Sequence, residues 1–253
     1  MSIHEFGQHH PHKVLLLHPS VVMWDYFEAV IPLLEPHVHV IVPALPGYDP
    51  ERPGDFTSIE DIARELELLW LEKGWGKVSG IYGCSMGGSI VIRLLANRKL
   101  PICHAIIDGG ITPYQLPWLV TRFIALKDFL MIYLGKLGGI KLLERAFATD
   151  SYSPEDLRYI EAVLKKMSAK TIWRTFDSCN NYSMPEPITS DCEHIEYWFS
   201  AAEENARKHD IAYVRQHFPQ ATFRRFDQVG HGGLAVLKPE LLAAGILRLT
   251  PAP

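Results

Sequence analysis

The chain has 253 residues, of which 47% are hydrophobic and 21% charged, and its formal net charge is −4. This length and composition are those of one globular domain with a large core, or of one domain that carries an insertion. The weak acidity argues against nucleic acid or an anionic membrane as a partner, because those surfaces are normally met by clustered Lys and Arg. The sequence contains no such cluster.

No segment of the sequence reads as a membrane span or a secretion signal. The most apolar stretch, residues 129–134, is followed by Gly135 and Lys136 and is far shorter than the roughly 20 residues that cross a bilayer. Residues 1–13 are polar and rich in His, unlike a secretion signal. The four cysteines are too few and too scattered for a disulfide framework, and no Cys-x-x-Cys pair indicates a metal site. We therefore expect a cytoplasmic protein with reduced thiols and no metal.

Short apolar runs alternate with longer helical patterns, which is typical of a largely parallel sheet flanked by helices. The predicted strands are residues 14–18, 38–42, 78–82, 104–107, 195–199 and 222–226. Between the second and third strands, Ile62 and Leu66 mark the apolar face of a helix predicted over residues 58–73. Thr57 and Glu60 have the spacing of a capping box at its start.

The alternation stops after residue 108. From residue 112 to residue 187 no strand is predicted, and aromatic-rich helical segments replace the pattern. We expect residues 112–187 to form a helical lid, inserted into a core domain made of residues 1–111 and 188–253. Aromatic side chains of this segment, such as Trp118 and Phe123, are expected either to pack inside the lid or to border a substrate pocket.

A Gly-x-Ser-x-Gly motif, made of Gly83, Ser85 and Gly87, follows the third predicted strand and opens a helical pattern. A sharp turn of this kind lifts a serine hydroxyl above the sheet, and the glycines allow neighbouring backbone to pass closely. The bare pattern also occurs by chance, but the strand before it and the helix after it are the context that the turn requires. It predicts Ser85 as a nucleophile; the alternative is a tight strand-to-helix turn without chemistry.

With this motif in this context, the chain resembles the α/β-hydrolase family from about residue 14 to the C-terminal helix. The resemblance implies an α/β-hydrolase fold and a nucleophile, acid and base in the chain order Ser, Asp or Glu, His. Residues 228–233 follow the last predicted strand and resemble the Gly-His segment of the family, which implies that His231 is the base. A neutral imidazole takes the serine proton and returns it to the leaving group.

The position of the acid stays open at this point. In the family the acid usually lies in a Gly-x-x-Asp turn after the seventh strand, where this chain has residues 200–203, which end in Glu203. The match between residues 200–203 and the Gly-x-x-Asp turn can shift by one residue, so Glu204 is a second candidate for the acid. Some members carry the acid after the sixth strand, where this chain has Asp108. Asp108 also reads as an ordinary turn cap, and Glu203 as part of the acidic first turn of a helix.

His18, Pro19 and Ser20 end the first long strand, where the family has His-Gly followed by a residue whose backbone N–H binds the oxyanion. Pro19 replaces the glycine and has no N–H, but the donor in the family is the following position. The resemblance therefore implies an oxyanion hole made by the N–H groups of Ser20 and Met86. The alternative is a buried turn that binds no ligand.

The resemblance implies a serine hydrolase of the carboxylesterase type. It would cleave a carboxylic ester of a small or medium apolar substrate through an acyl-enzyme on Ser85, without a cofactor. Thioesterase, lactonase and carbon–carbon bond hydrolase activities use the same machinery, and the fold does not choose among them. A small-molecule binding or receptor protein stays open too, because such a protein can keep all three residues. The expected partner is a small ester or acyl molecule, and a homodimer stays open.

Overall fold

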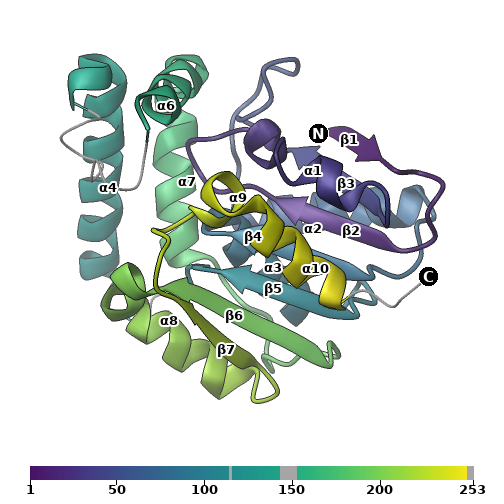
Figure 1. Ribbon diagram of the computed structural model, residues 1–253. Helices are drawn as coiled ribbons and strands as arrows, with labels where there is room; N and C mark the ends of the chain where they lie inside the picture. Colours follow the sequence, from purple (N-terminus) through teal and green to yellow (C-terminus); the bar gives the residue numbers. More distant parts are fainter. Residues whose placement is uncertain (114–115, 143–152, 250–253) are drawn as a thin grey trace.

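The computed structural model describes residues 1–113, 116–142 and 153–249, and a seven-stranded sheet lies at its centre (Figure 1). The strands are β1 Ser2–Phe6, β2 Lys13–Leu17, β3 His39–Ala44, β4 Gly80–Cys84, β5 His104–Asp108, β6 His194–Ser200 and β7 Thr222–Phe226. Their order across the sheet is β1-β3-β2-β4-β5-β6-β7. Only the β1–β3 pair is antiparallel within this sheet, so the predicted largely parallel sheet is confirmed.

β1 is the strand that the sequence analysis did not predict. It pairs with β3 from Ser2 opposite Ala44 to Phe6 opposite Val40, and all five of its residues are half-buried. An edge strand of this kind needs no continuous apolar run, so its sequence carries little signal. The other six strands lie within two residues of their predicted positions.

Helices cover both faces of the sheet. One face is covered by α2 Ile59–Glu72, α3 Met86–Asn97 and α8 Glu204–His217, and the other by α1 Ile31–Leu34 and α10 Pro239–Leu249. Successive side chains of a strand point to opposite faces. In β2, Leu15 and Leu17 therefore join the first core, and Val14 and Leu16 join the second. The short helices are η1 Trp24–Phe27, η2 Ala201–Glu203 and α9 Leu234–Leu237, and of these η1 and α9 contribute side chains to the second core.

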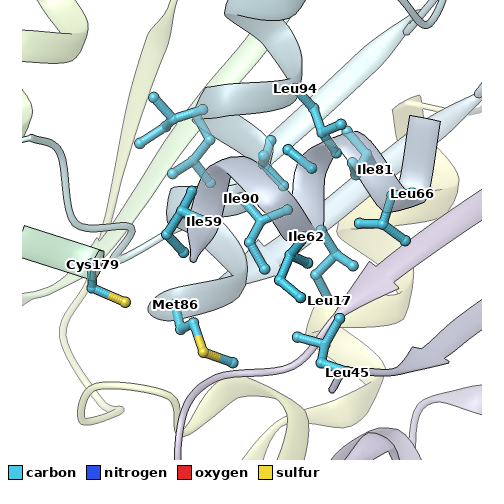
Figure 2. Packing of buried hydrophobic residues seen from close by; sticks show 14 of the residues in the cluster. Leu17, Leu45, Ile59, Ile62, Leu66, Ile81, Met86, Ile90, Leu94 and Cys179 are labelled. Carbon is cyan, nitrogen blue, oxygen red and sulfur yellow. The ribbon is translucent and has the colours of Figure 1, made fainter. Parts of the chain in front are cut away.

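The helix predicted over residues 58–73 is confirmed as α2, but its cap is one residue later than expected. Ser58, and not Thr57, is the N-cap, and its hydroxyl accepts a hydrogen bond from the Asp61 backbone N–H at 3.0 Å. This cap satisfies one of the N–H groups that have no partner inside the helix. The buried face of α2 packs against α3 in the core of Figure 2, which includes Ile59, Ile62, Leu66, Ile90 and Leu94.

The segment between β5 and β6 is helical where the structure describes it. It contains α4 Trp118–Gly138, α6 Pro154–Lys166 and α7 Ala169–Asn181, and α4 packs against the other two helices. The three helices lie at the carboxyl ends of the parallel strands (Figure 1). Residues 114–115 and 143–152 of the predicted lid are outside the described part of the chain. Among the described helices, none is long and apolar enough to span a bilayer.

Candidate active site

Ser85 occupies the turn between β4 and α3. Its backbone has φ +52° and ψ −113°, in a region that residues other than glycine rarely adopt. The flanking glycines are required by close packing. A Cβ at Gly83 would lie 2.3 Å from the carbonyl oxygen of Gly87, and one at Gly87 would lie 2.2 Å from that of Leu17. The Ser85 N–H donates to the Asp108 carbonyl at 2.8 Å, so the turn is held between β2 and β5.

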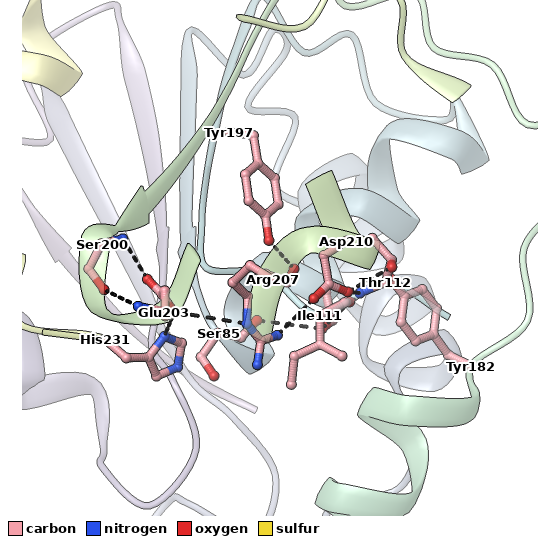
Figure 3. Close-up of polar contacts among 12 residues, drawn as sticks. Ser85, Ile111, Thr112, Tyr182, Tyr197, Ser200, Glu203, Arg207, Asp210 and His231 are labelled. Atoms are coloured by element: carbon pink, nitrogen blue, oxygen red, sulfur yellow. Dashed lines mark hydrogen bonds and ion pairs between the residues drawn. The ribbon is translucent and has the colours of Figure 1, made fainter. Parts of the chain in front are cut away.

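His231 and Glu203 form a hydrogen-bonded pair beside this turn. The imidazole Nδ1–H donates to Oε2 of Glu203 at 2.5 Å (Figure 3). The other carboxylate oxygen, Oε1, accepts from the Ser200 backbone N–H at 2.8 Å, so both oxygens have a donor. Because Nδ1 is engaged by the carboxylate, Nε2 is the ring nitrogen left for proton transfer. Ser85 and His231 line the same pocket, and Figure 3 shows the serine side chain next to the imidazole.

Glu203 is held in its ionised form by its surroundings. Burial opposes ionisation, but the hydrogen bond and charge of His231, the Ser200 N–H and the Arg207 charge outweigh it and lower the pKa of Glu203. Arg207, one turn further along, has Nε 3.9 Å from Oε2 of Glu203, and its Nη1 lies 3.1 Å from Oδ2 of Asp210. The sequence analysis missed Arg207, although its position four residues after Glu203 on a helix was an available signal.

The two other candidate acids have different partners. The Asp108 carboxylate accepts a hydrogen bond from the Tyr82 hydroxyl at 2.6 Å, and burial raises the pKa of Asp108 to about 6. Glu204 is exposed and forms an ion pair with Arg225 at 3.0 Å. Of the three carboxylates considered from the sequence, Glu203 is therefore the one that is hydrogen-bonded to His231.

The backbone around His231 is held by residues that the sequence analysis did not single out for that role. Tyr26, in η1, donates its hydroxyl proton to the Gly232 carbonyl at 2.7 Å. The backbone of Gly109, directly after β5, packs against the side chains of His231 and Glu203, and a side chain at position 109 would collide with them. No local pattern identifies Tyr26, because its partner lies more than 200 residues away in the sequence.

The loop after β2 places Ser20 at the pocket, beside the start of α3. Ser20 lines the pocket, and Met86 is the first residue of α3, so its N–H has no partner within the helix. His18 is fully buried, and its Nδ1–H donates to the Pro19 carbonyl at 2.8 Å. Burial lowers the pKa of His18 to about 4, so this imidazole is neutral at pH 7. His18 thus organises the loop, and the oxyanion role of Ser20 and Met86 stays a prediction.

A pocket of about 650 Å³ extends from Ser85 and His231 to the helices between β5 and β6. Its far wall includes Ile132, Tyr159, Ile160 and Phe176 from α4, α6 and α7. Trp118 and Phe123, expected in the lid core or at the pocket, lie in neither place: Trp118 is exposed at the first turn of α4, and Phe123 is exposed on the side of α4 opposite its buried residues. Within the described residues, no group of three or more His, Cys, Asp or Glu side chains is arranged to hold a metal ion.

The sequence pattern of the chain matches the model of the alpha/beta hydrolase family over residues 14–244. This match covers most of the chain. The protein belongs to the α/β-hydrolase family. The fold expected from the Gly-x-Ser-x-Gly turn and the parallel sheet is therefore confirmed for this α/β-hydrolase.

Solved structures resemble this α/β-hydrolase along nearly its whole length. A carboxylesterase of Nitrososphaera gargenis is 18% identical with a TM-score of 0.76, and 98% of this chain and 92% of that chain are covered. A thermophilic esterase from Thermogutta terrifontis is 17% identical with a TM-score of 0.74, covering 98% and 91%. A hydrolase from Oleispira antarctica is 17% identical with a TM-score of 0.75, covering 97% and 93%. At these identities the likeness establishes the fold alone. No curated protein sequence matches the chain significantly.

Proposed function

We propose that this α/β-hydrolase is a serine hydrolase that cleaves a carboxylic ester of a small or medium apolar substrate. In this proposal Ser85 is the nucleophile, His231 the general base and Glu203 the acid that orients it. The observation that carries the proposal is the 2.5 Å hydrogen bond between His231 and Glu203, in the pocket that the strained Ser85 turn also lines. Nucleophilic acyl transfer requires a nucleophile, a base and an acid that orients the base, all at one pocket.

The proposed reaction proceeds in two steps. Oγ of Ser85 attacks the ester carbonyl carbon while Nε2 of His231 takes the hydroxyl proton, and the Glu203 carboxylate stabilises the imidazolium that forms. The N–H groups of Ser20 and Met86 donate to the oxyanion of the tetrahedral intermediate. The imidazolium then protonates the departing alcohol, which leaves an acyl-enzyme on Ser85. Water, activated by His231, attacks that acyl group and releases the acid.

The charges that line the pocket favour an uncharged substrate. Its described lining includes five carboxyl side chains and one guanidinium, that of Arg207. The five are Asp25, Glu28, Asp128, Glu155 and Asp156. A polyanionic thioester of a nucleotide carrier would be repelled by this lining, whereas a neutral ester would not. Two of the similar structures are esterases, which supports the same choice.

We also propose that residues 112–187 act as the lid of this pocket and that the protein works in the cytoplasm. The lid is supported by α4, α6 and α7, each of which supplies side chains to the far wall. The location is supported by the four cysteines, all of which are free thiols, as is usual in a reducing compartment.

Turnover of a series of p-nitrophenyl esters of increasing acyl length tests the proposed function, together with labelling by a fluorophosphonate. We expect repeated turnover, a preference for particular acyl lengths, and one labelled site at Ser85. A binding or receptor protein would instead release at most one equivalent of product. The same series with thioesters and lactones compares the alternative reactions, and a higher kcat/KM on either class would contradict the ester assignment.

A further inference from the structure

The loop after β2 and the first part of η1 form one segment, residues 18–26, which lines much of one side of the pocket. We call it the oxyanion segment. Ser20, near its start, carries an N–H proposed for the oxyanion hole. Tyr26, at its end, holds the backbone beside His231 through its hydrogen bond to the Gly232 carbonyl. The position of this segment therefore bears on two parts of the proposed reaction.

The oxyanion segment contains a strained residue directly after Ser20. Val21 has φ +60°, in the left-handed region that a β-branched residue rarely adopts. A residue persists in such a conformation only when its surroundings hold it there. On the side before Val21, the hydrogen bond from His18 to the Pro19 carbonyl fixes the chain. Without an attachment on the other side, the turn at Val21 could relax and move the Ser20 N–H.

That second attachment comes from α6, in the helical segment between β5 and β6. The hydroxyl of Tyr159 accepts a hydrogen bond from the Met23 backbone N–H at 3.0 Å and donates its own proton to the Asp25 carboxylate. Met23 is buried and directly precedes η1, and Asp25 lies in the first turn of that helix. One hydroxyl thus holds two positions of the oxyanion segment, which lie 136 and 134 residues away in the sequence.

Tyr159 is itself well placed to act as a fixed point. Its side chain packs against both hydrophobic cores, and it also lines the pocket. Burial, together with the hydrogen bond to Asp25, raises the pKa of Tyr159, so the hydroxyl keeps its proton at neutral pH. A phenylalanine would fill the same space, but it could bind neither the Met23 N–H nor the Asp25 carboxylate.

α7 is attached to the core domain at a different place. The Ser178 hydroxyl accepts from the Ile59 backbone N–H at 2.8 Å, at the start of α2. This bond is of the same kind as that between Tyr159 and Met23, since in both a side-chain hydroxyl of the predicted lid accepts from a buried residue of the core domain. Neither Ser178 nor Ile59 is among the described residues that line the pocket. Ser178 therefore offers a matched control.

We propose that Tyr159 is a positioning residue of the active site, which holds the turn at Val21 so that the Ser20 N–H points at the oxyanion. In this role Tyr159 acts through Met23 and Asp25 and not on the substrate. The inference rests on the proposed function, because it concerns the oxyanion hole of that reaction. It gives α6 a part in catalysis in addition to its place in the pocket wall.

Tyr159→Phe tests the inference, because it removes the hydroxyl and keeps the ring. The N–H of Met23 then loses its acceptor, and a buried N–H without an acceptor is costly, so we expect the oxyanion segment to shift. On a p-nitrophenyl ester, kcat should fall by at least about tenfold while KM changes by less than about twofold, since an oxyanion hole stabilises the transition state and not the bound ester. Ser178→Ala should keep kcat within about twofold.

An alkyl trifluoromethyl ketone reports on the oxyanion hole without turnover. Oγ of Ser85 adds to its carbonyl carbon, the serine proton passes to Nε2 of His231, and the carbonyl oxygen becomes the oxyanion. Its inhibition constant should rise in Tyr159→Phe by about the factor by which kcat falls. The matching methyl ketone, which binds without this addition, should keep its inhibition constant. A mere loss of folded protein would lower the apparent kcat and leave both constants unchanged.

Val21→Gly tests the link to the strained turn, because glycine adopts φ +60° without strain. In a protein that carries Val21→Gly, the added change Tyr159→Phe should lower kcat by less than about threefold. A loss of the same size with and without Val21→Gly would overturn the inference.

The inference is equally overturned if Tyr159→Phe keeps kcat within about twofold of the unaltered protein, or if Ser178→Ala lowers kcat as much as Tyr159→Phe does. Failure of the proposed function looks different. In that case the unaltered protein shows neither ester turnover nor a fluorophosphonate label at Ser85, and the inference fails with it. Normal turnover in both the unaltered protein and Tyr159→Phe would refute the role of Tyr159 alone.

Discussion

Gly109 and His231 lie so close together that a Cβ atom at position 109 would be 2.8 Å from the imidazole Nδ1. The same atom would be 3.0 Å from Oε2 of Glu203. Gly109 has φ +56°, and its N–H donates to the Trp198 carbonyl at 2.8 Å, so its backbone is tied to β6. The backbone of the turn after β5 is therefore fixed in place, and it packs directly against the hydrogen-bonded side chains of His231 and Glu203.

Gly109→Ala should lower kcat/KM by about a hundredfold, because an added carbon displaces the pair and an error of about 1 Å in a catalytic group can have that effect. Gly74→Ala is the matched control: Gly74 has φ +62°, and a Cβ there meets nothing within 4 Å. Gly74→Ala should lose about 1 kcal/mol of stability through backbone strain, and Gly109→Ala should lose more, because its added Cβ also meets His231 and Glu203. Steady-state kinetics and thermal melting separate the two effects. Equal activity of the two variants would mean that the turn after β5 does not position His231.

Ser85→Ala should lower ester hydrolysis by several powers of ten and abolish fluorophosphonate labelling, while the protein stays folded. Ser20→Ala is the comparison, because it removes a hydroxyl at the pocket and keeps the backbone N–H proposed for the oxyanion hole. It should keep the label and most of the activity. Mass spectrometry of the labelled peptide identifies the site, and a label on any serine other than Ser85 would refute the assignment.

Glu203→Gln should lower kcat by at least about a hundredfold with little change in melting temperature. The glutamine oxygen can still accept from the Ser200 N–H, but its amide group no longer holds the Nδ1 proton of His231. Glu203→Asp should be impaired as well, since a side chain shorter by one methylene leaves a gap to His231. Near-normal kinetics in both variants would exclude Glu203 as the acid.

Asp108→Asn should change kcat by less than about tenfold, because Asp108 is hydrogen-bonded to Tyr82 and not to His231. Its effect on stability should depend on pH. The pKa of Asp108 is raised by burial from 3.8 to about 6, so the folded protein loses stability as pH rises through this window and the carboxyl ionises. Asparagine does not ionise. The melting temperature of the variant relative to the original protein should therefore increase between pH 4 and pH 7, and a difference that does not vary with pH would contradict the assignment.

Much of the fold, including the strand-to-helix turn that carries Ser85, could be predicted because the required residues are neighbours in the sequence. The turn at Ser85 needs glycine at positions 83 and 87, since their Cβ atoms would collide with the backbone of α3 and β2. Strands buried on both faces need continuous apolar runs, which made β2 and β3 readable. These constraints act over a few residues, so the sequence by itself determined the parallel sheet, the strand-to-helix turn and the place of Ser85.

Only the tertiary structure decided which carboxylate pairs with His231. Asp108 is the last residue of β5, and Glu203 follows the adjacent parallel strand β6, so the carboxyl ends of both strands lie at the same edge of the sheet. Both are therefore near the pocket, and the choice depends on Tyr82, which binds Asp108 from a third strand. The exposed side of α4 was also undecided, because this helix is apolar on most of its surface and its buried side is set by α7. Contacts between distant segments leave no local pattern, which is why the sequence alone could not choose.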